Sequence, residues 1–193
     1  DVPQKRERVF IVSVRNDILE NLGHHISGGM VFPDFTDRIF PNPNLYGYSQ
    51  RDSIYDLLKD RENIKEGNEL EEIMKTNKKY PFLKKLPKDP KVYQSVGDIN
   101  PTGNFFQTRR IPWDDASNTI LEKGLETKFF SHIHPEKDRG FTTYEAMRLM
   151  GLPEGFKLVG DLNERLSLVG LMVAPPQMHH LSKYIFENVI FNE

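Results

Sequence analysis

The segment Arg139-Gly-Phe-Thr-Thr-Tyr-Glu-Ala-Met-Arg-Leu-Met-Gly-Leu-Pro153 contains the start and the stop of a complete short helix. Thr142 and Glu145 have the spacing of a capping box, in which each side chain accepts a hydrogen bond from the other residue's backbone N–H. Apolar residues follow at helical spacing, and Gly151 and Pro153 then end the pattern. We therefore predict a helix that begins after Thr142 and ends before Gly151.

Similar patterns predict an element near each end of the chain. Pro175-Pro176 precedes apolar residues at helical spacing, which predicts a terminal helix. The segment Arg8-Val-Phe-Ile-Val-Ser-Val-Arg15 is rich in β-branched and apolar residues and predicts a largely buried strand. Because an unpaired strand leaves an exposed edge, we expect this segment to pair with a sheet or with a second copy of the chain.

The middle of the chain is irregular, but two helix starts stand out. Ser49 with Asp52 marks the first start, and Asn68 with Glu71 marks the second. The lysine-rich stretch that follows, residues 75–91, is interrupted by three prolines and cannot form a long helix.

The composition is that of a globular protein. The chain of 193 residues has a formal net charge of −2, with 37% hydrophobic and 28% charged residues. No apolar run approaches membrane-spanning length. The sequence contains no cysteine, which excludes disulfide bonds, thiolate metal ligands and a cysteine nucleophile within this chain.

Charge is unevenly distributed along the chain. Residues 51–72 contain four basic and eight acidic residues, whereas residues 75–91 contain seven lysines and one aspartate. The second stretch suits a polyanion with its condensed counterions. A lysine-rich loop that is simply exposed to solvent is the alternative.

Four segments resemble, in the right order, motifs of the DNA (cytosine-5)-methyltransferase family. Residues 1–8, Asp-Val-Pro-Gln-Lys-Arg-Glu-Arg, resemble its Gln-x-Arg-x-Arg motif, and residues 139–153 resemble the next motif. Residues 169–176 resemble the last motif, and residues 110–120 resemble the segment that closes the target-recognition region. The middle of the chain, about residues 18–106, falls where the family has its variable target-recognition domain.

The resemblance implies an α+β fold with three parts. Residues 1–17 would be a strand segment of the catalytic domain, and residues 18–138 a small, irregular, mostly-β target-recognition domain with short helices. Residues 139–193 would carry the C-terminal motifs and a terminal helix that returns to the α/β catalytic domain. Because the family's cofactor-binding and Pro-Cys motifs are missing, we expect this chain to be the C-terminal half of such an enzyme.

The resemblance also implies roles for single residues. Arg8 would bond the O2 atom of a flipped-out cytosine, while Gln4 and Arg6 would hold the backbone or the active-site loop near that base. Met172 and Val173 would form an apolar wall of the site for S-adenosylmethionine, which would be bound mainly by the N-terminal half.

The expected partners are double-stranded DNA and the N-terminal catalytic half of the methyltransferase. Phosphate contacts are predicted for basic residues of the middle region, namely Lys78, Lys79, Lys84, Lys85, Lys88, Lys91, Arg109 and Arg110. Candidates for reading base edges are Gln50, Arg51, Gln94 and Gln107. The histidine pairs lack further ligands at the spacing of a zinc site, so no metal site is predicted.

Two structural roles are also expected. Trp113, the only tryptophan, is predicted to be an anchor in the core or at a domain interface. Glu145 and Arg148 are predicted to form a buried or half-buried pair that braces the recognition domain.

The leading hypothesis is therefore the DNA-recognition and base-holding part of a cytosine-5 methyltransferase of a restriction–modification system. Such an enzyme would act in the cytoplasm of a bacterium or phage-infected cell, at the nucleoid when bound to DNA. Leu171 stands where the family has an asparagine, and it favours the alternative of a stand-alone or degenerate DNA-binding module. The acidic net charge favours a second alternative, a protein-interaction domain.

Overall fold

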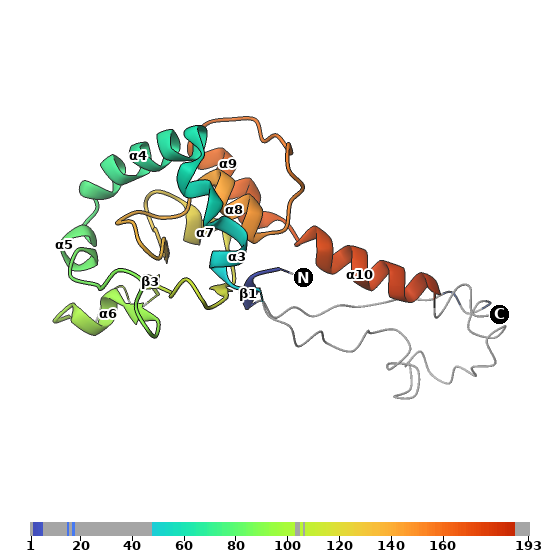
Figure 1. Cartoon of the computed structure of the whole chain (residues 1–193), viewed down its shortest axis with the longest axis horizontal. Helices are drawn as coiled ribbons and strands as arrows, with labels where there is room; N and C mark the ends of the chain where they lie inside the picture. The colour runs from blue at the N-terminus through green and yellow to red at the C-terminus, as the bar shows by residue number, and fades with distance from the viewer. Residues whose placement is uncertain are drawn as a thin grey trace.

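The computed structural model describes residues 2–5, 15, 17, 48–102, 105 and 107–187. Its helices are α3 (Gln50–Ile54), η1 (Asp56–Lys59), α4 (Arg61–Lys75), α5 (Tyr80–Leu83), α6 (Val96–Ile99), α7 (Glu122–Leu125), α8 (Thr143–Leu149), α9 (Leu162–Leu171) and α10 (Pro175–Ile185). In Figure 1, α7, α8 and α9 lie together in the body, α5 and α6 lie at one end, and α10 projects from the other.

The strands are short and form two small sheets. β1 (Gln4–Lys5) pairs in parallel with β4 (Ser117–Asn118). In the second sheet, β3 (Arg109–Arg110) lies between β2 (Gln94–Ser95), which is antiparallel to it, and β5 (His132–Ile133), which is parallel to it. Both parallel pairings join segments that are far apart in the sequence.

Several predicted helix boundaries are confirmed. Ser49 and Asp52 form the capping box of α3, and Thr142 and Glu145 form that of α8. Gly151 follows the end of α8 with a φ of +71°, a left-handed conformation that glycine adopts without the steric cost of a Cβ. The predicted terminal helix is α10, and its first two residues are the prolines that were expected to precede it.

The predicted helix start at Asn68 is wrong. Helix α4 begins two turns earlier, at Arg61, because the side chain of Asp60 accepts a hydrogen bond from the backbone N–H of Asn63 and caps the helix. Asn68 therefore lies inside the helix. The lysine-rich stretch behaves as predicted and contains only the four-residue helix α5.

Helix α9 was not predicted from the sequence, although it has a recognisable signal. Asp161 and Glu164 form a capping box at its start. The last residues of α9, Val169–Leu171, belong to the segment that resembles the family's last motif. This segment therefore contains the last residues of α9, the connection to α10 and the first residues of α10.

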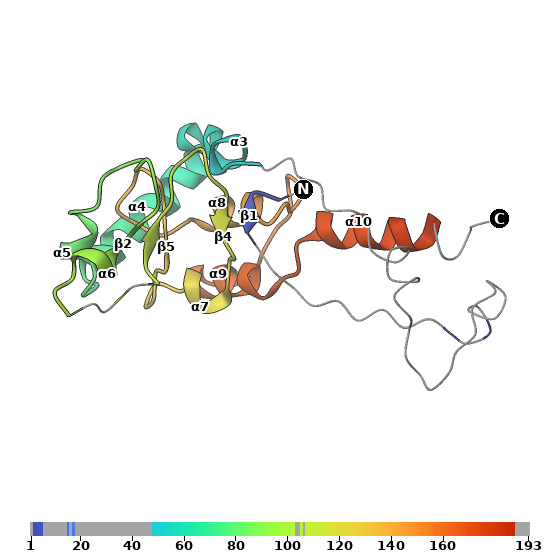
Figure 2. The ribbon, with the colours of Figure 1, turned by 90° about the horizontal axis from the view of Figure 1, so that it is seen from below.

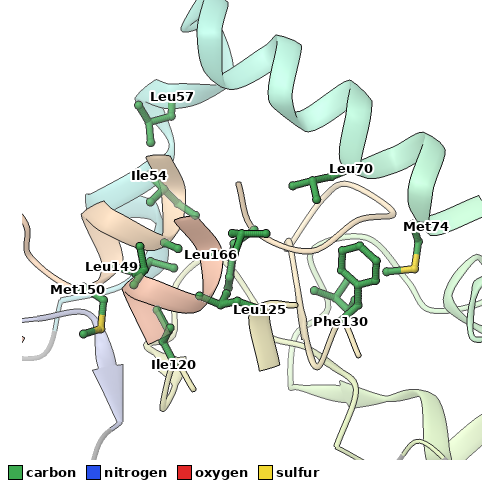
Figure 3. Close-up of a cluster of buried hydrophobic side chains, with 14 of the residues drawn as sticks. Ile54, Leu57, Leu70, Met74, Ile120, Leu125, Phe130, Leu149, Met150 and Leu166 are labelled. Atoms are coloured by element: carbon green, nitrogen blue, oxygen red, sulfur yellow. The ribbon is translucent and has the colours of Figure 1, made fainter. Parts of the chain in front are cut away.

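One hydrophobic core runs through the helical body, and Trp113 belongs to it, as predicted, with 2% of its surface exposed. Figure 3 shows Met74 of α4 facing Phe130, while Ile120 lies below Leu149 of α8 in this view. Figure 2 shows the same body from below, with α10 again extending away from it.

The hydrophobic core is continuous across the expected domain boundary at residue 138. Core residues lie on both sides of residue 138, and α8 packs against α3, α4 and α9. In the described part of residues 18–138, helices also contain more residues than the two-residue strands do, so this part is less rich in strands than expected. The division into three parts and the α+β class stay predictions.

None of the helices in the described ranges is long and apolar enough to cross a membrane. This finding concerns only these helices.

Gly170 provides a test of the packing between α9 and α7. A Cβ at this position would lie 2.2 Å from the backbone nitrogen of Glu122, closer than any real contact. We expect Gly170→Ala to lower the free energy of unfolding by about 1–3 kcal/mol, because the helices must move apart. Urea denaturation measures the change. Leu171→Ala, at an exposed neighbouring position, is the control and should change the stability by less than about 0.5 kcal/mol.

Candidate functional site

The side chain of Gln4 connects three parts of the chain. Its Nε2 donates hydrogen bonds to the carbonyl oxygen of Leu149 (3.2 Å) and to the Sδ of Met150 (3.1 Å). Its Oε1 accepts a hydrogen bond from the backbone N–H of Ile120 (3.3 Å). The side chain is buried, so these contacts replace hydrogen bonds to water.

Three of the family-like segments therefore meet at Gln4. Residue 4 belongs to the first segment, Ile120 ends the segment 110–120, and Leu149 and Met150 belong to the segment 139–153. Figure 3 shows Met150 beside strand β1. Gln4 holds backbone groups of Leu149 and Ile120, and its predicted role near the target base stays a prediction. Arg6 and Arg8 lie outside the described residues, as does nearly all of the predicted strand 8–15.

Glu145 is the centre of a buried polar network. Its carboxylate accepts hydrogen bonds from Nη1 and Nη2 of Arg139 (2.7 and 2.8 Å), from the backbone N–H of Thr142 (2.9 Å) and from Nδ2 of Asn63 (3.1 Å). The prediction that Glu145 pairs with Arg148 is wrong. Arg148 points outward and pairs with Glu154 instead (2.8 Å).

Helices α4, α8 and α9 are joined by the same network. Asn63 of α4 also donates to the carbonyl oxygen of Leu57, and Glu66 accepts from the backbone N–H of Thr143 at the start of α8. The other oxygen of Glu66 bonds Arg165 of α9 (2.9 Å). A side chain of α4 therefore bonds each of the other two helices.

The environment keeps Glu145 ionised. Burial alone raises the pKa of this carboxyl, but the Arg139 guanidinium and the hydrogen bonds to the carboxylate outweigh burial and lower it to about 2. A buried carboxylate with several donors is stable only while those donors stay in place.

Two buried histidines lie next to this network. Nδ1 of His134 accepts hydrogen bonds from the backbone N–H groups of Glu136 (3.0 Å) and Lys137 (3.1 Å), so the proton of the neutral ring is on Nε2, which faces Glu145 at 3.6 Å. Burial lowers the pKa of His134 to about 3 and that of His132 to about 4. Across the described ranges, no three His, Asp or Glu side chains are grouped as metal ligands would be.

Arg110 was predicted to bind DNA, but its place in the structure excludes a phosphate contact. The side chain has no exposed surface and donates to the carbonyl oxygens of His134 (2.7 Å), Pro135 (3.2 Å) and Lys137 (2.8 Å). It also bonds Asp138 (2.6 Å). Arg110 holds the turn after β5 and is structural, which the sequence did not show because all its partners lie more than 20 residues away.

Gln50 is likewise removed from the candidates for reading bases. It is fully buried, and its Nε2 donates to the carbonyl oxygen of Pro112 (3.0 Å). Arg51 lies between Asp114 (2.6 Å) and Asp89 (3.6 Å), with its Cζ over the ring of Trp113, 5.8 Å from the ring centroid. Gln107 is exposed and Gln94 is half-buried, so both stay candidates.

Other predicted DNA-binding residues lie around α5 and β3. Lys78, Lys84 and Lys85 are exposed, whereas Lys79 is half-buried and donates to the carbonyl oxygen of Phe129. Arg109 lies over the ring of Tyr93, with its Cζ 5.4 Å from the ring centroid.

The predicted cofactor wall lies between α9 and α10. Met172 ends α9 and packs against the core, whereas Val173 and Leu171 are 45% and 62% exposed. Other residues line the two described grooves, of about 290 and 610 Å³. Val173 and Leu171 thus present exposed aliphatic surface, and the role of Met172 and Val173 at a cofactor site stays a prediction.

The family model of C-5 cytosine-specific DNA methylases matches residues 1–187, and the chain therefore belongs to this family. The resemblance inferred from the motifs is confirmed. Members of the family use S-adenosylmethionine as methyl donor.

Related methyltransferases come from bacteria and plants. The chain is 26% identical over 171 residues to the type II methyltransferase M.Eco47II of Escherichia coli, covering 88% of this chain and 39% of that protein. It is 24% identical over 191 residues to the type II methyltransferase M.Sau96I of Staphylococcus aureus, covering 98% of this chain and 40% of that one. A shorter match, 36% identical over 67 residues, links 35% of the chain to 6% of the DNA (cytosine-5)-methyltransferase CMT1 of Oryza sativa subsp. japonica. The chain thus spans about two fifths of these bacterial relatives.

The junction at Gln4 can be tested by substitution. We expect Gln4→Ala to lower the free energy of unfolding by about 1–3 kcal/mol, because it removes the buried hydrogen bonds of Gln4 to Leu149 and Ile120. Lys5→Ala is the matched control. It removes an exposed ion pair with Asp115, so its effect should stay below about 1 kcal/mol. Equal losses in both variants would contradict a special role for Gln4.

The buried titratable groups predict how stability depends on pH. As the pH falls below 6.5, unfolded chains protonate His132 and His134, while folded chains do so only near pH 4 and pH 3. Below about pH 4.5, Glu145 also lowers the stability of the fold, because unfolded chains protonate it there while its pKa in the folded chain is about 2. Stability should therefore be full above pH 6.5 and fall by a few kcal/mol towards pH 4.

Urea midpoints measured between pH 7.5 and pH 4 check this dependence. Replacing His179 and His180, which are exposed on α10, with glutamine should leave the profile unchanged. A midpoint that is constant from pH 7 to pH 4 would rule the mechanism out.

Proposed function

We propose that this chain is the DNA-recognition and base-holding part of a DNA cytosine-5 methyltransferase. The observation that carries the proposal is the junction at Gln4, where three segments that resemble separate family motifs are bonded to one another. Motifs that act on one base must lie close together, and this junction supports such an arrangement.

In this proposal, residues 1–8 present the arginines to the target base. Gln4 fixes the start of the segment in the body, and Arg8 follows four residues later. A guanidinium stays protonated at neutral pH and donates several hydrogen bonds, so Arg8 would bond O2 of the cytosine and stabilise charge that develops on the ring. Arg6 would hold the adjacent backbone. The cytosine would be turned out of the duplex to reach them.

The remaining chemistry needs groups that this chain does not contain. In the family reaction, a cysteine thiolate adds to C6 of cytosine and makes C5 nucleophilic, and this sequence has no cysteine. S-adenosylmethionine would supply the methyl group, with Met172 and Val173 at one apolar wall of its site. A catalytic half with the Pro-Cys motif is therefore the proposed partner, with double-stranded DNA as substrate and the cytoplasm as the place of action.

One observation favours a second candidate, a DNA-binding module without methyltransferase activity. Leu171, which replaces an asparagine of the family pattern, is 62% exposed at the end of α9. A leucine cannot make the polar contact that an asparagine would make beside the methyl donor.

Methyl transfer distinguishes the two candidates. The chain is combined with the polypeptide that supplies the Pro-Cys motif, and transfer of labelled methyl groups from S-adenosylmethionine to duplex DNA is measured. We expect transfer by the combination and a loss of about 10²–10³-fold in Arg8→Ala, because a donor to the developing charge is removed. Arg15→Ala, which removes only an exposed pair with Asp17, is the control and should retain activity.

The alternative outcomes are distinct. Duplex binding without methyl transfer would favour the DNA-binding module. Absence of both transfer and duplex binding would exclude both candidates.

A further inference from the structure

The lysine-rich segment 75–91 contains two kinds of lysine. Three of its lysines already have a partner in the protein. Lys75 and Lys88 are exposed and pair with Glu72 and Asp138, and the half-buried Lys79 donates to the carbonyl oxygen of Phe129. Burial lowers the pKa of Lys79 to about 8. These three side chains are poorer candidates for binding an external anion, because each would have to give up its partner.

The other four lysines of the segment are exposed, and among the described residues none of them has an ion-pair partner. They are Lys78, Lys84, Lys85 and Lys91. Exposed cations without a carboxylate partner keep their full charge for an external anion.

Two of these lysines lie over aromatic rings. The Nζ of Lys84 is 5.7 Å from the ring centroid of Tyr80, and that of Lys85 is 5.9 Å from the ring centroid of Phe82. Both rings are half-buried and pack against the hydrophobic core. The rings are therefore fixed, and each restricts the positions of the flexible lysine stem above it.

Restriction of this kind favours binding of a fixed array of anions. A lysine loses side-chain entropy when it is held against a phosphate, and a side chain that is already restricted loses less. Lys84 and Lys85 are also adjacent in sequence directly after α5, so their two positive charges lie close together.

The segment lies at one end of the body, where Figures 1 and 2 both place α5 opposite α10. The acidic stretch, with eight acidic and four basic residues in 51–72, covers α3, η1 and most of α4, and α4 ends at Lys75, shortly before α5 begins at Tyr80. The net charge therefore changes sign between α4 and α5, and an anionic ligand would be attracted to the exposed lysines at the α5 end.

We propose that Lys84 and Lys85 bind the phosphate backbone of duplex DNA, with Tyr80 and Phe82 as positioning residues and Lys78 and Lys91 at the edges of the surface. This inference rests on the proposed function and deepens it, because it assigns the phosphate-binding set and removes Lys79, Lys88 and Arg110 from it. Contacts of this kind position the duplex without reading its sequence.

The salt dependence of duplex binding tests the lysines. The dissociation constant of the full chain for a fluorescent duplex is measured by anisotropy at several salt concentrations. We expect the double substitution Lys84→Gln, Lys85→Gln to reduce the slope of log K against log salt by about 1.8, because two phosphate contacts are lost. The matched control replaces Lys59 and Lys65, exposed lysines of the acidic stretch, with glutamine and should leave the slope unchanged.

The positioning role of the rings is tested without changing charge. Tyr80→Leu should weaken duplex binding roughly two- to five-fold, the loss expected for one cation–π contact, and leave the salt slope unchanged. Tyr80→Phe keeps the ring and should bind as the unsubstituted chain does. Thermal melting of each variant verifies that the fold is intact, and a variant that unfolds is replaced by the corresponding change at Phe82.

The inference is overturned if the Lys84/Lys85 and the Lys59/Lys65 double substitutions reduce the salt slope equally, or if neither of them changes it. It is also overturned if the chain binds no duplex. If Tyr80→Leu binds the duplex as tightly as the unsubstituted chain, the positioning role of that residue is overturned. Methyl transfer by the combined halves is a separate measurement. The proposed function can therefore hold while this assignment fails.

Discussion

The buried carboxylate of Glu145 is the group on which the arrangement of the helical body depends. It has no exposed surface and is bonded by Arg139, by the start of its own helix and by Asn63 of α4. An ionised group in this position is stable only if its donors are present, so the pairing requires α4, α8 and the turn before α8 to be folded together. The network replaces several independent contacts with one cooperative unit.

This cooperative unit supports the segments that resemble the family's motifs. Helix α8 follows directly from the Glu145 network, and its last turn accepts the hydrogen bond from Gln4. The strand β1 and residue 120 are joined to the same point. In the proposed function, the rigidity of α8 would therefore be transmitted to the arginines that follow Gln4, and a base held by them would have a fixed position relative to the recognition region.

Charge has two separate roles in this chain. Arg110 and Arg139 are buried, Lys79 is half-buried and Lys88 is exposed, and each of the four has an acceptor in the protein. Lys84 and Lys85 stay exposed over aromatic rings. Net charge alone does not distinguish these roles, because the same residue type serves both and only the positions of the acceptors differ.

The sequence by itself determined the features whose partners lie close together along the chain. The capping boxes at Ser49 and Thr142 and the terminal helix at Pro175 were predicted because donor and acceptor are three residues apart or because proline restricts its own backbone. Family membership was predicted from the order of the motifs. Only the tertiary structure decided that Glu145 pairs with Arg139 rather than Arg148 and that Arg110 is buried, because these outcomes depend on which segments meet in space.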